Sequence, residues 1–118
     1  MIIGTGVDIT EVTRLRKAVE RWGESFLTRI FTRIELQNAK TRVSLYQHLA
    51  GRFAAKEAVF KAAGDVRLNW KDIEIINDKA GKPLCRILNN KGKKIDVFVS
   101  ISHVKSYAVA NAIITSKT

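Results

Sequence analysis

The fold of this 118-residue chain is decided by the stretch Leu49-Ala-Gly-Arg-Phe-Ala-Ala-Lys-Glu-Ala-Val-Phe-Lys-Ala-Ala-Gly64. Its alanines favour an α-helix, and a glycine commonly follows the C-terminus of a helix. Glu57 and Lys61 are four residues apart, so they point the same way from that helix. Small neighbours on this face leave space beside the two charges: Ala50, Ala54 and Ala58. Large apolar residues on an adjacent arc indicate a half-buried helix: Leu49, Phe53, Val59 and Phe60.

Met1 to Thr10 are predicted to form a strand, because one face alternates Ile3, Thr5, Val7 and Ile9. The other face carries two glycines and then a carboxylate, namely Gly4, Gly6 and Asp8. Glycine in a strand marks close approach by either a ligand or another backbone. Asp8 has two interpretations: it is a functional carboxylate, or it caps the following helix, with Glu11 three residues further on.

The next segments are predicted to be helical. Thr10 to about Trp22 is amphipathic, with an apolar set at helical spacing: Val12, Leu15, Val19 and Trp22. A different face carries a basic stripe of Arg14, Lys17 and Arg21. Such a stripe is usually a solvated face, but it also suits docking of an acidic helix or a polyanion. Thr32 to Glu35 is a capping-box pattern that opens a short helix, and the central helix runs from about Val43 to Ala63.

The second half of the chain has the pattern of strands separated by turns. The predicted strands are 72–76, 84–88, 95–103 and 107–114, and the turns are 77–83, 89–94 and 104–106. A strand, then helices, then an antiparallel meander define an α+β fold. At this length the chain is expected to be one domain, residues 1–118.

Composition limits the class of protein. With 46% hydrophobic and 27% charged residues the chain is neither disordered nor membrane-spanning, and we expect a cytoplasmic protein. The single Cys85 with His48 and His103 gives no zinc-site spacing. Lys and Arg outnumber Asp and Glu by 21 to 11, a net charge of +10 that predicts an anionic partner. Nucleic acid, an acidic protein and a phosphate-rich small molecule all fit this charge.

Asp8 and Glu57 together supply two hard oxygen ligands, a set that suits Mg²⁺ bound to phosphates. Lys61 would hold a phosphate as a compact positive charge. A metal ion, a lysine and a positively charged cleft are the usual parts of phosphoryl-type transfer. Since no Ser/His/Asp or Cys/His set can be assembled, the nucleophile is expected to come from the partner.

Several stretches resemble the holo-[acyl-carrier-protein] synthase family in order and spacing. They are Gly4-Thr-Gly-Val-Asp-Ile-Thr-Glu11, Phe31-Thr-Arg-Ile-Glu35, Leu49 to Gly64, Gly81-Lys-Pro83 and Val99-Ser-Ile-Ser-His103. The resemblance implies the 4'-phosphopantetheinyl transferase fold, a long central helix packed on an antiparallel sheet, in a homotrimer with active sites between subunits. It implies transfer of the 4'-phosphopantetheine group of coenzyme A to a serine of apo acyl carrier protein, for fatty acid biosynthesis, with release of adenosine 3',5'-bisphosphate.

The resemblance also implies roles for individual residues. Asp8 and Glu57 match the Mg²⁺ ligands, and Lys61 matches the lysine that engages the pyrophosphate, so these three form the catalytic set. The coenzyme A contacts would come from a further set: Arg52, Lys61, Gly64, Lys82, Pro83 and His103. The carrier protein would dock on Arg14, Arg21 and Phe26.

Some points stay open at this level. The proton acceptor for the serine could be Glu57, a water on the metal or Lys61. His103 is either a phosphate contact or a structural histidine. One departure from the family pattern, Asp65-Val66-Arg67 after Gly64, removes a glycine and adds negative charge near the phosphate path, which puts this loop's contribution to coenzyme A binding in question.

Two rival functions remain. A small basic nucleic-acid-binding module explains the charge, but it leaves the Gly-x-Gly-x-Asp strand and Glu57 unexplained, and the chain lacks an aromatic stacking platform. We therefore expect no nucleic-acid and no membrane partner. The second rival is a phosphopantetheinyl transferase that serves a different carrier protein.

Overall fold

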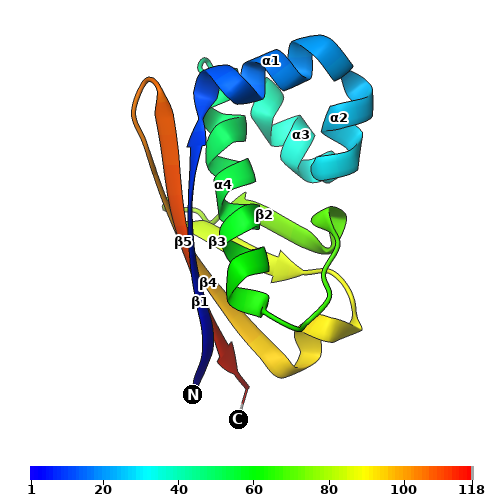
Figure 1. Ribbon diagram of the computed structural model, residues 1–118, viewed down its shortest axis with the longest axis vertical. Coiled ribbons are helices and arrows are strands. Elements are labelled where there is room, and N and C mark those ends of the chain that lie inside the picture. Colours follow the sequence, from blue (N-terminus) through cyan, green and yellow to red (C-terminus); the bar gives the residue numbers. More distant parts are fainter. Residues whose placement is uncertain (118) are drawn as a thin grey trace.

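Helix α4 (Leu45–Ala63) is the long central element of the computed structural model, which describes residues 1–117 (Figure 1). The other helices are α1 (Val12–Trp22), α2 (Glu24–Ile30) and α3 (Arg33–Lys40), with short 3-10 turns at Trp70–Asp72 and Asn90–Lys94. The strands are β1 (Ile2–Glu11), β2 (Ile73–Asn77), β3 (Pro83–Ile87), β4 (Ile95–His103) and β5 (Tyr107–Ser116). Each predicted helix and strand is present, with ends that differ by one or two residues.

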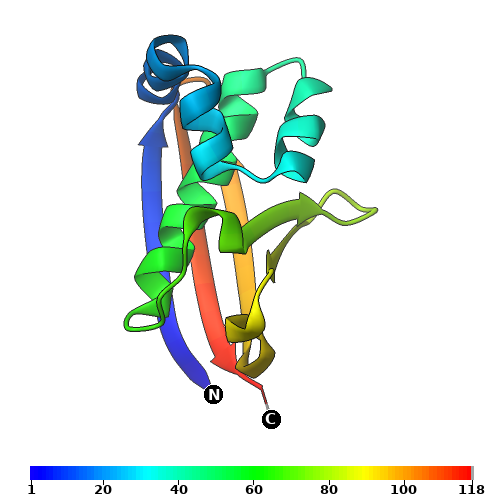
Figure 2. The same cartoon turned by 90° about the vertical axis from the view of Figure 1, so that its right-hand side faces the viewer.

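The strands form two antiparallel sheets rather than one meander. One sheet has the order β1-β5-β4, and the other is the β2-β3 hairpin (Figure 2). The expectation of a continuous meander over the second half of the chain is wrong, because β3 and β4 belong to different sheets; β1 from the start of the chain pairs with β5, the last strand. In the register, Asp8 lies opposite Ala110 and His103 lies opposite Ala108. The fold class, a long helix on an antiparallel sheet, is confirmed.

Glycines and alanines bring helix and sheet unusually close. A Cβ atom at Gly4 would lie 1.8 Å from the carbonyl oxygen of Ala62, and one at Gly6 would lie 2.1 Å from that of Ala58. The two glycines therefore admit the backbone of α4 rather than a ligand. The alanines at positions 50, 54 and 58 are fully buried in the core. The expectation that they leave ligand space beside Glu57 is wrong.

A buried ionic network fixes α4 against α3 and β2. Lys56 donates to a carboxylate oxygen of Glu35 at 2.7 Å and to the carbonyl oxygens of Ile30 and Trp70 at 2.9 Å each. Glu35 belongs to the predicted capping box at Thr32, which the structure confirms. It also accepts from the Ile75 amide at 2.7 Å. The side chains of Lys56 and Glu35 are fully buried, so loss of any of these partners would leave a buried charged group without one of its hydrogen bonds.

The face of the three-stranded sheet opposite α4 carries exposed apolar side chains. In Figure 1 this sheet stands at the edge of the molecule with α4 on one side only. The exposed residues are Ile3, Val7, Ile9, Phe98, Tyr107 and Val109. Trp22, expected on the apolar face of α1, is also 56% exposed and lies under the guanidinium of Arg21. No helix within residues 1–117 is long and apolar enough to cross a membrane.

Candidate active site

Asp8 and Lys61 meet where β1 crosses α4. The Lys61 ammonium lies 3.2 Å from Oδ1 of Asp8 and donates to the carbonyl oxygen of Val7 at 2.9 Å. The Thr10 hydroxyl donates to Oδ2 of the same carboxylate at 3.0 Å. Helix α1 starts at Val12 without a side-chain cap, so the interpretation of Asp8 as a helix cap is wrong. Each oxygen of the Asp8 carboxylate thus has a hydrogen-bond partner, Lys61 on one and Thr10 on the other.

Glu57 lies on α4, one turn before Lys61, and its carboxylate is close to that of Asp8 on β1. Partial burial raises the pKa of the Glu57 carboxyl, the negative charge of Asp8 raises it further, and the Lys61 charge lowers it. Two carboxylates that face one another in this way create a concentration of negative charge. The sequence pattern correctly placed both acids and Lys61 together.

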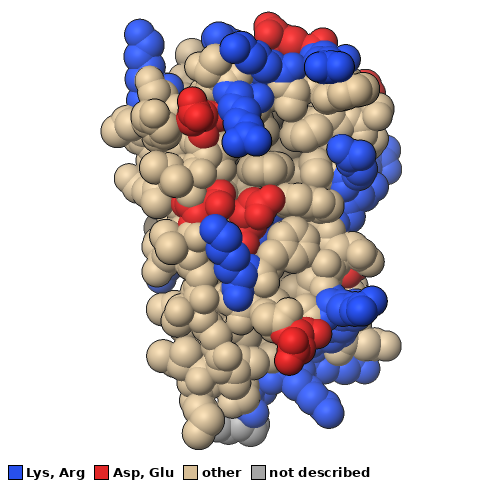
Figure 3. Space-filling model, viewed as in Figure 1, with Lys and Arg blue, Asp and Glu red and all other residues tan. Residues whose placement is uncertain are grey.

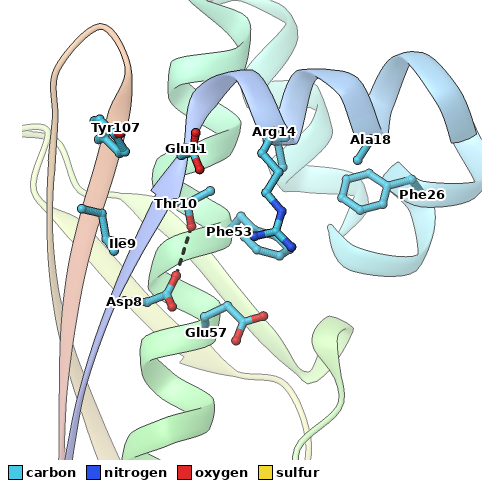
Figure 4. A pocket seen from close by; sticks show the side chains of 11 residues that line it. Asp8, Ile9, Thr10, Glu11, Arg14, Ala18, Phe26, Phe53, Glu57 and Tyr107 are labelled. Carbon is cyan, nitrogen blue, oxygen red and sulfur yellow. Dashed lines mark hydrogen bonds between the residues drawn. The ribbon is translucent and has the colours of Figure 1, made fainter.

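A cavity of about 500 Å³ opens directly beside the two acids. Figure 4 shows Asp8 and Glu57 at one end and Arg14 reaching in from α1, with Phe26 and Phe53 along the wall. The rings of Phe26 and Phe53 stack with their centroids 6.5 Å apart. Figure 3 shows acidic surface in the middle of this face, with basic side chains above and below it. The predicted carrier-docking residues Arg14 and Phe26 therefore adjoin the acidic pair.

A second, cationic cluster lies around Arg52. Its guanidinium donates to the side-chain oxygen of Asn77 at 2.9 Å, and Asn77 pairs with Pro83 across the β2-β3 hairpin. His48, one turn earlier on α4, has its pKa lowered to about 4, first by burial and then by the charges of Arg52, Arg42 and His103. His103 is exposed at the end of β4, so the alternative of a buried structural histidine is wrong.

These two groups of residues lie on different sides of α4. Arg52 and Glu57 are five positions apart, which separates them by about 140° around the helix axis. The structure therefore brings Asp8, Glu57 and Lys61 together, and separately links Arg52 to the hairpin that carries Lys82 and Pro83. His103 is near the same part of α4, because its charge and that of Arg52 both act on His48. Gly64 ends α4 with φ 58°, which explains the glycine, and it lies on the loop after Lys61.

Sequence reasoning missed two residues of these clusters, Thr10 and His48, and the buried Lys56 that fixes α4. Thr10 follows Asp8 by two residues, so strand alternation could have placed both side chains on one face. His48 precedes Arg52 by four residues, which is the spacing of helix neighbours. Lys56 carried no such signal, because its partner Glu35 is distant in the chain.

The acidic pair fits a small hard cation. Burial and then the negative charge of Asp8 raise the pKa of Glu57, so a divalent ion between the two carboxylates would relieve their repulsion. Among residues 1–117 no cluster of three or more His, Cys, Asp or Glu side chains could enclose a metal. A site with two protein ligands matches the habit of Mg²⁺, which keeps several waters and shares its shell with phosphates.

Comparison with known proteins identifies the family. Residues 4–112 match the model of the 4'-phosphopantetheinyl transferase superfamily. The chain is 44% identical to the holo-[acyl-carrier-protein] synthase of Thermodesulfovibrio yellowstonii, over 98% of this chain and 100% of that protein. It is 41% identical to the Halothermothrix orenii protein of that name, over 93% and 94%.

Solved structures agree with the sequence matches. The Bacillus anthracis holo-(acyl-carrier-protein) synthase in complex with CoA (3',5'-ADP) superposes with a TM-score of 0.85 at 37% identity, covering 100% of this chain and 99% of that one. The Neisseria meningitidis enzyme gives 0.87 at 30% identity, with 98% and 99% coverage.

The chain therefore belongs to the 4'-phosphopantetheinyl transferase superfamily and, within it, to the holo-[acyl-carrier-protein] synthases. Its activity is transfer of phosphopantetheine from coenzyme A to apo acyl carrier protein, in fatty acid biosynthesis.

Proposed function

We propose that Asp8 and Glu57 hold a Mg²⁺ ion and that Lys61 binds the pyrophosphate of coenzyme A during this transfer. The observation that carries the proposal is the acidic pair with one lysine at the mouth of the cavity. When bound, the metal would neutralise the charge that develops on the phosphates. Thr10 would keep the Asp8 carboxylate in one orientation. Glu57, whose side chain lines the cavity, would take the serine proton.

Coenzyme A would reach from one chain to the next. Arg52, Lys82, Pro83 and His103 are the expected contacts for the nucleotide end, and Arg52 with the hairpin it contacts lies on the side of α4 away from Glu57. A single ligand that uses both groups needs the acids of one chain and the cations of a partner chain. We therefore propose that each active site is shared between two subunits.

A homotrimer is the proposed assembly, and the open sheet face supports it. The side chains of Ile3, Val7 and Ile9 are 50%, 60% and 64% exposed, although a strand so rich in branched residues normally has such a face covered. Strands β4 and β5 add Phe98 and Val109 to the same surface. Burial of this apolar face against a second copy would bring two chains together along their sheets.

The carrier protein would dock along α1. Arg14 reaches the cavity and Arg21 continues the basic stripe on the same helix, so an acidic helix could lie across them. Phe26 at the cavity wall would receive an apolar side chain of the carrier. This surface accounts for part of the net charge of +10 without a nucleic-acid partner.

We further propose that residues 1–118 act as one domain in the cytoplasm, where coenzyme A and the fatty-acid carrier are available. A carrier protein of another pathway remains the alternative acceptor.

The proposal is tested by incubating the purified protein with coenzyme A and apo acyl carrier protein, with Mg²⁺ or with a chelator, and weighing the carrier by mass spectrometry. We expect the gain of one phosphopantetheinyl group only when Mg²⁺ is present. Transfer that persists after chelation would contradict the metal site. A panel of apo carriers identifies the acceptor, which is the one modified with the highest kcat/KM.

A further inference from the structure

We propose that Lys61 is a resident counter-ion of the metal site, which neutralises the carboxylates in the free protein and leaves them when metal and coenzyme A bind. The inference rests on the proposed Mg²⁺ site. It assigns Lys61 a second role, in the free enzyme, beside its proposed contact with the pyrophosphate.

The contacts of Lys61 place its charge where a cation is needed. The ammonium lies 3.2 Å from Oδ1 of Asp8, the oxygen that Thr10 leaves free. The carbonyl oxygen of Val7 holds the ammonium from a second direction at 2.9 Å. Glu57 lies four residues before Lys61 on the same face of α4, so the ammonium is close to both acids. Lys61 thus takes part of the role that a bound metal would have.

The same contacts are weak enough to exchange. The Lys61 side chain is 54% exposed, and an exposed ion pair contributes only about 0–1 kcal/mol. Its flexible stem lets the ammonium move away from Asp8 without a change in the backbone. Lys56, five positions earlier on α4, is the opposite case, because it is fully buried and holds three partners. Of the two lysines, only Lys61 can be released at low cost.

Exchange couples metal binding to coenzyme A binding. A metal ion that binds Asp8 must displace or repel the Lys61 ammonium, so Lys61 opposes metal binding in the free enzyme. A pyrophosphate group beside the site offers the ammonium another partner and removes this opposition. By linkage, coenzyme A then tightens metal binding, and the metal tightens coenzyme A binding by the same factor.

The test measures Mn²⁺ affinity of the free protein by electron paramagnetic resonance, without coenzyme A, for wild type, Lys61→Met, Lys61→Arg and Asp8→Asn. Methionine keeps the length of the side chain and removes its charge, whereas arginine keeps the charge. We expect Lys61→Met to bind Mn²⁺ about two- to fivefold more tightly than wild type, and Lys61→Arg to match wild type. Thermal unfolding of each variant verifies that it is folded.

The outcomes separate this inference from the proposed function. If Asp8→Asn loses Mn²⁺ binding but Lys61→Met binds no more tightly than wild type, the counter-ion role is overturned and the metal site stands. If wild type and folded Asp8→Asn bind Mn²⁺ equally, the metal site itself fails. In a second measurement, added coenzyme A should tighten Mn²⁺ binding by a larger factor in wild type than in Lys61→Met. Equal factors would overturn the exchange.

Discussion

On one side of helix α4, Glu57 faces Asp8 and Lys61 beside an open cavity. On the other side, Arg52 faces Asn77, with His48 and His103 close by and no acidic residue among the causes that shift the pKa of His48. The first side carries the proposed metal ligands, and the second carries the cations proposed to contact phosphate. Because one rigid helix separates them, the two sides could contact the two ends of one coenzyme A only if they came from different chains, which is the arrangement proposed above.

The largest effect is expected from the acidic side. Glu57→Gln should lower kcat by about a thousandfold or more, because it removes a metal ligand and the proposed proton acceptor. The measurement is the rate of phosphopantetheine transfer at saturating coenzyme A and Mg²⁺. Activity within tenfold of wild type would show that Glu57 is not part of the chemistry.

Stability supplies the control for this variant. The pKa of Glu57 is raised on folding, so its contribution to stability is present at low pH and is lost as pH rises through the folded pKa. At pH 7 the free energy of unfolding of Glu57→Gln should therefore equal that of wild type or exceed it by less than about 1 kcal/mol. A clear loss of stability would contradict this expected sign and would show that the fall in kcat comes partly from unfolding.

The helix that separates the two sides depends on Lys56. Lys56→Met should lower the free energy of unfolding by about 3–5 kcal/mol, because it leaves the buried Glu35 charge without its cation. Urea unfolding measures the loss, and Lys61→Met is the matched control, with a change below about 1 kcal/mol. Equal effects at the two positions would remove the distinction between the buried and exposed lysines of α4.

The cationic side should affect binding rather than chemistry. Arg52→Ala should raise the KM for coenzyme A about ten- to a hundredfold with little change in kcat, because a charge-assisted phosphate contact is lost. Steady-state kinetics with either substrate varied provide the measurement. Arg14→Ala is the comparison variant, in which the KM for the carrier protein should rise instead. The reverse pattern would exchange the roles of the two surfaces.

The smallest effect concerns pH. His48 stays neutral in the folded protein because its pKa is lowered from 6.5 to about 4, whereas the unfolded chain binds a proton below 6.5. Wild type should therefore lose about 1–2 kcal/mol relative to His48→Gln as pH falls from 6.5 to 4. Parallel urea unfolding curves at several pH values test this. A difference between the two proteins that does not change with pH would contradict it.

The sequence predicted most of the fold because its signals were local. The alanine-rich stretch, the capping box at Thr32 and the alternation of β4 each specify an element from neighbouring residues. The pairing of β1 with β5 could not be read in the same way, since these strands are at opposite ends of the chain. Gly4 and Gly6 gave the right signal, close approach, without showing that the neighbour is α4.

The candidate site was predicted in part for the same reason. Glu57 and Lys61 share a helix face, and Asp8 follows a pattern that matches the family, so all three were found. The five-residue spacing of Arg52 and Glu57 already places the two side chains on different sides of α4. What each side chain faces depends on how α4 packs against the two sheets, which the spacing does not show. His48 became visible only when the fold brought Arg42 and His103 close to it.

The shared active site is tested most directly by mixing two inactive chains. One carries Glu57→Gln, and the other carries Arg52→Ala with His103→Ala; they are refolded together and assayed at coenzyme A concentrations well below the KM of the second variant. If each site takes its acids from one chain and its cations from the next, an equal mixture of the two chains should regain about a quarter of the wild-type activity, because random assembly gives one site in four an intact residue set from both chains. Activity no higher than the average of the two variants would show that each chain builds its site alone.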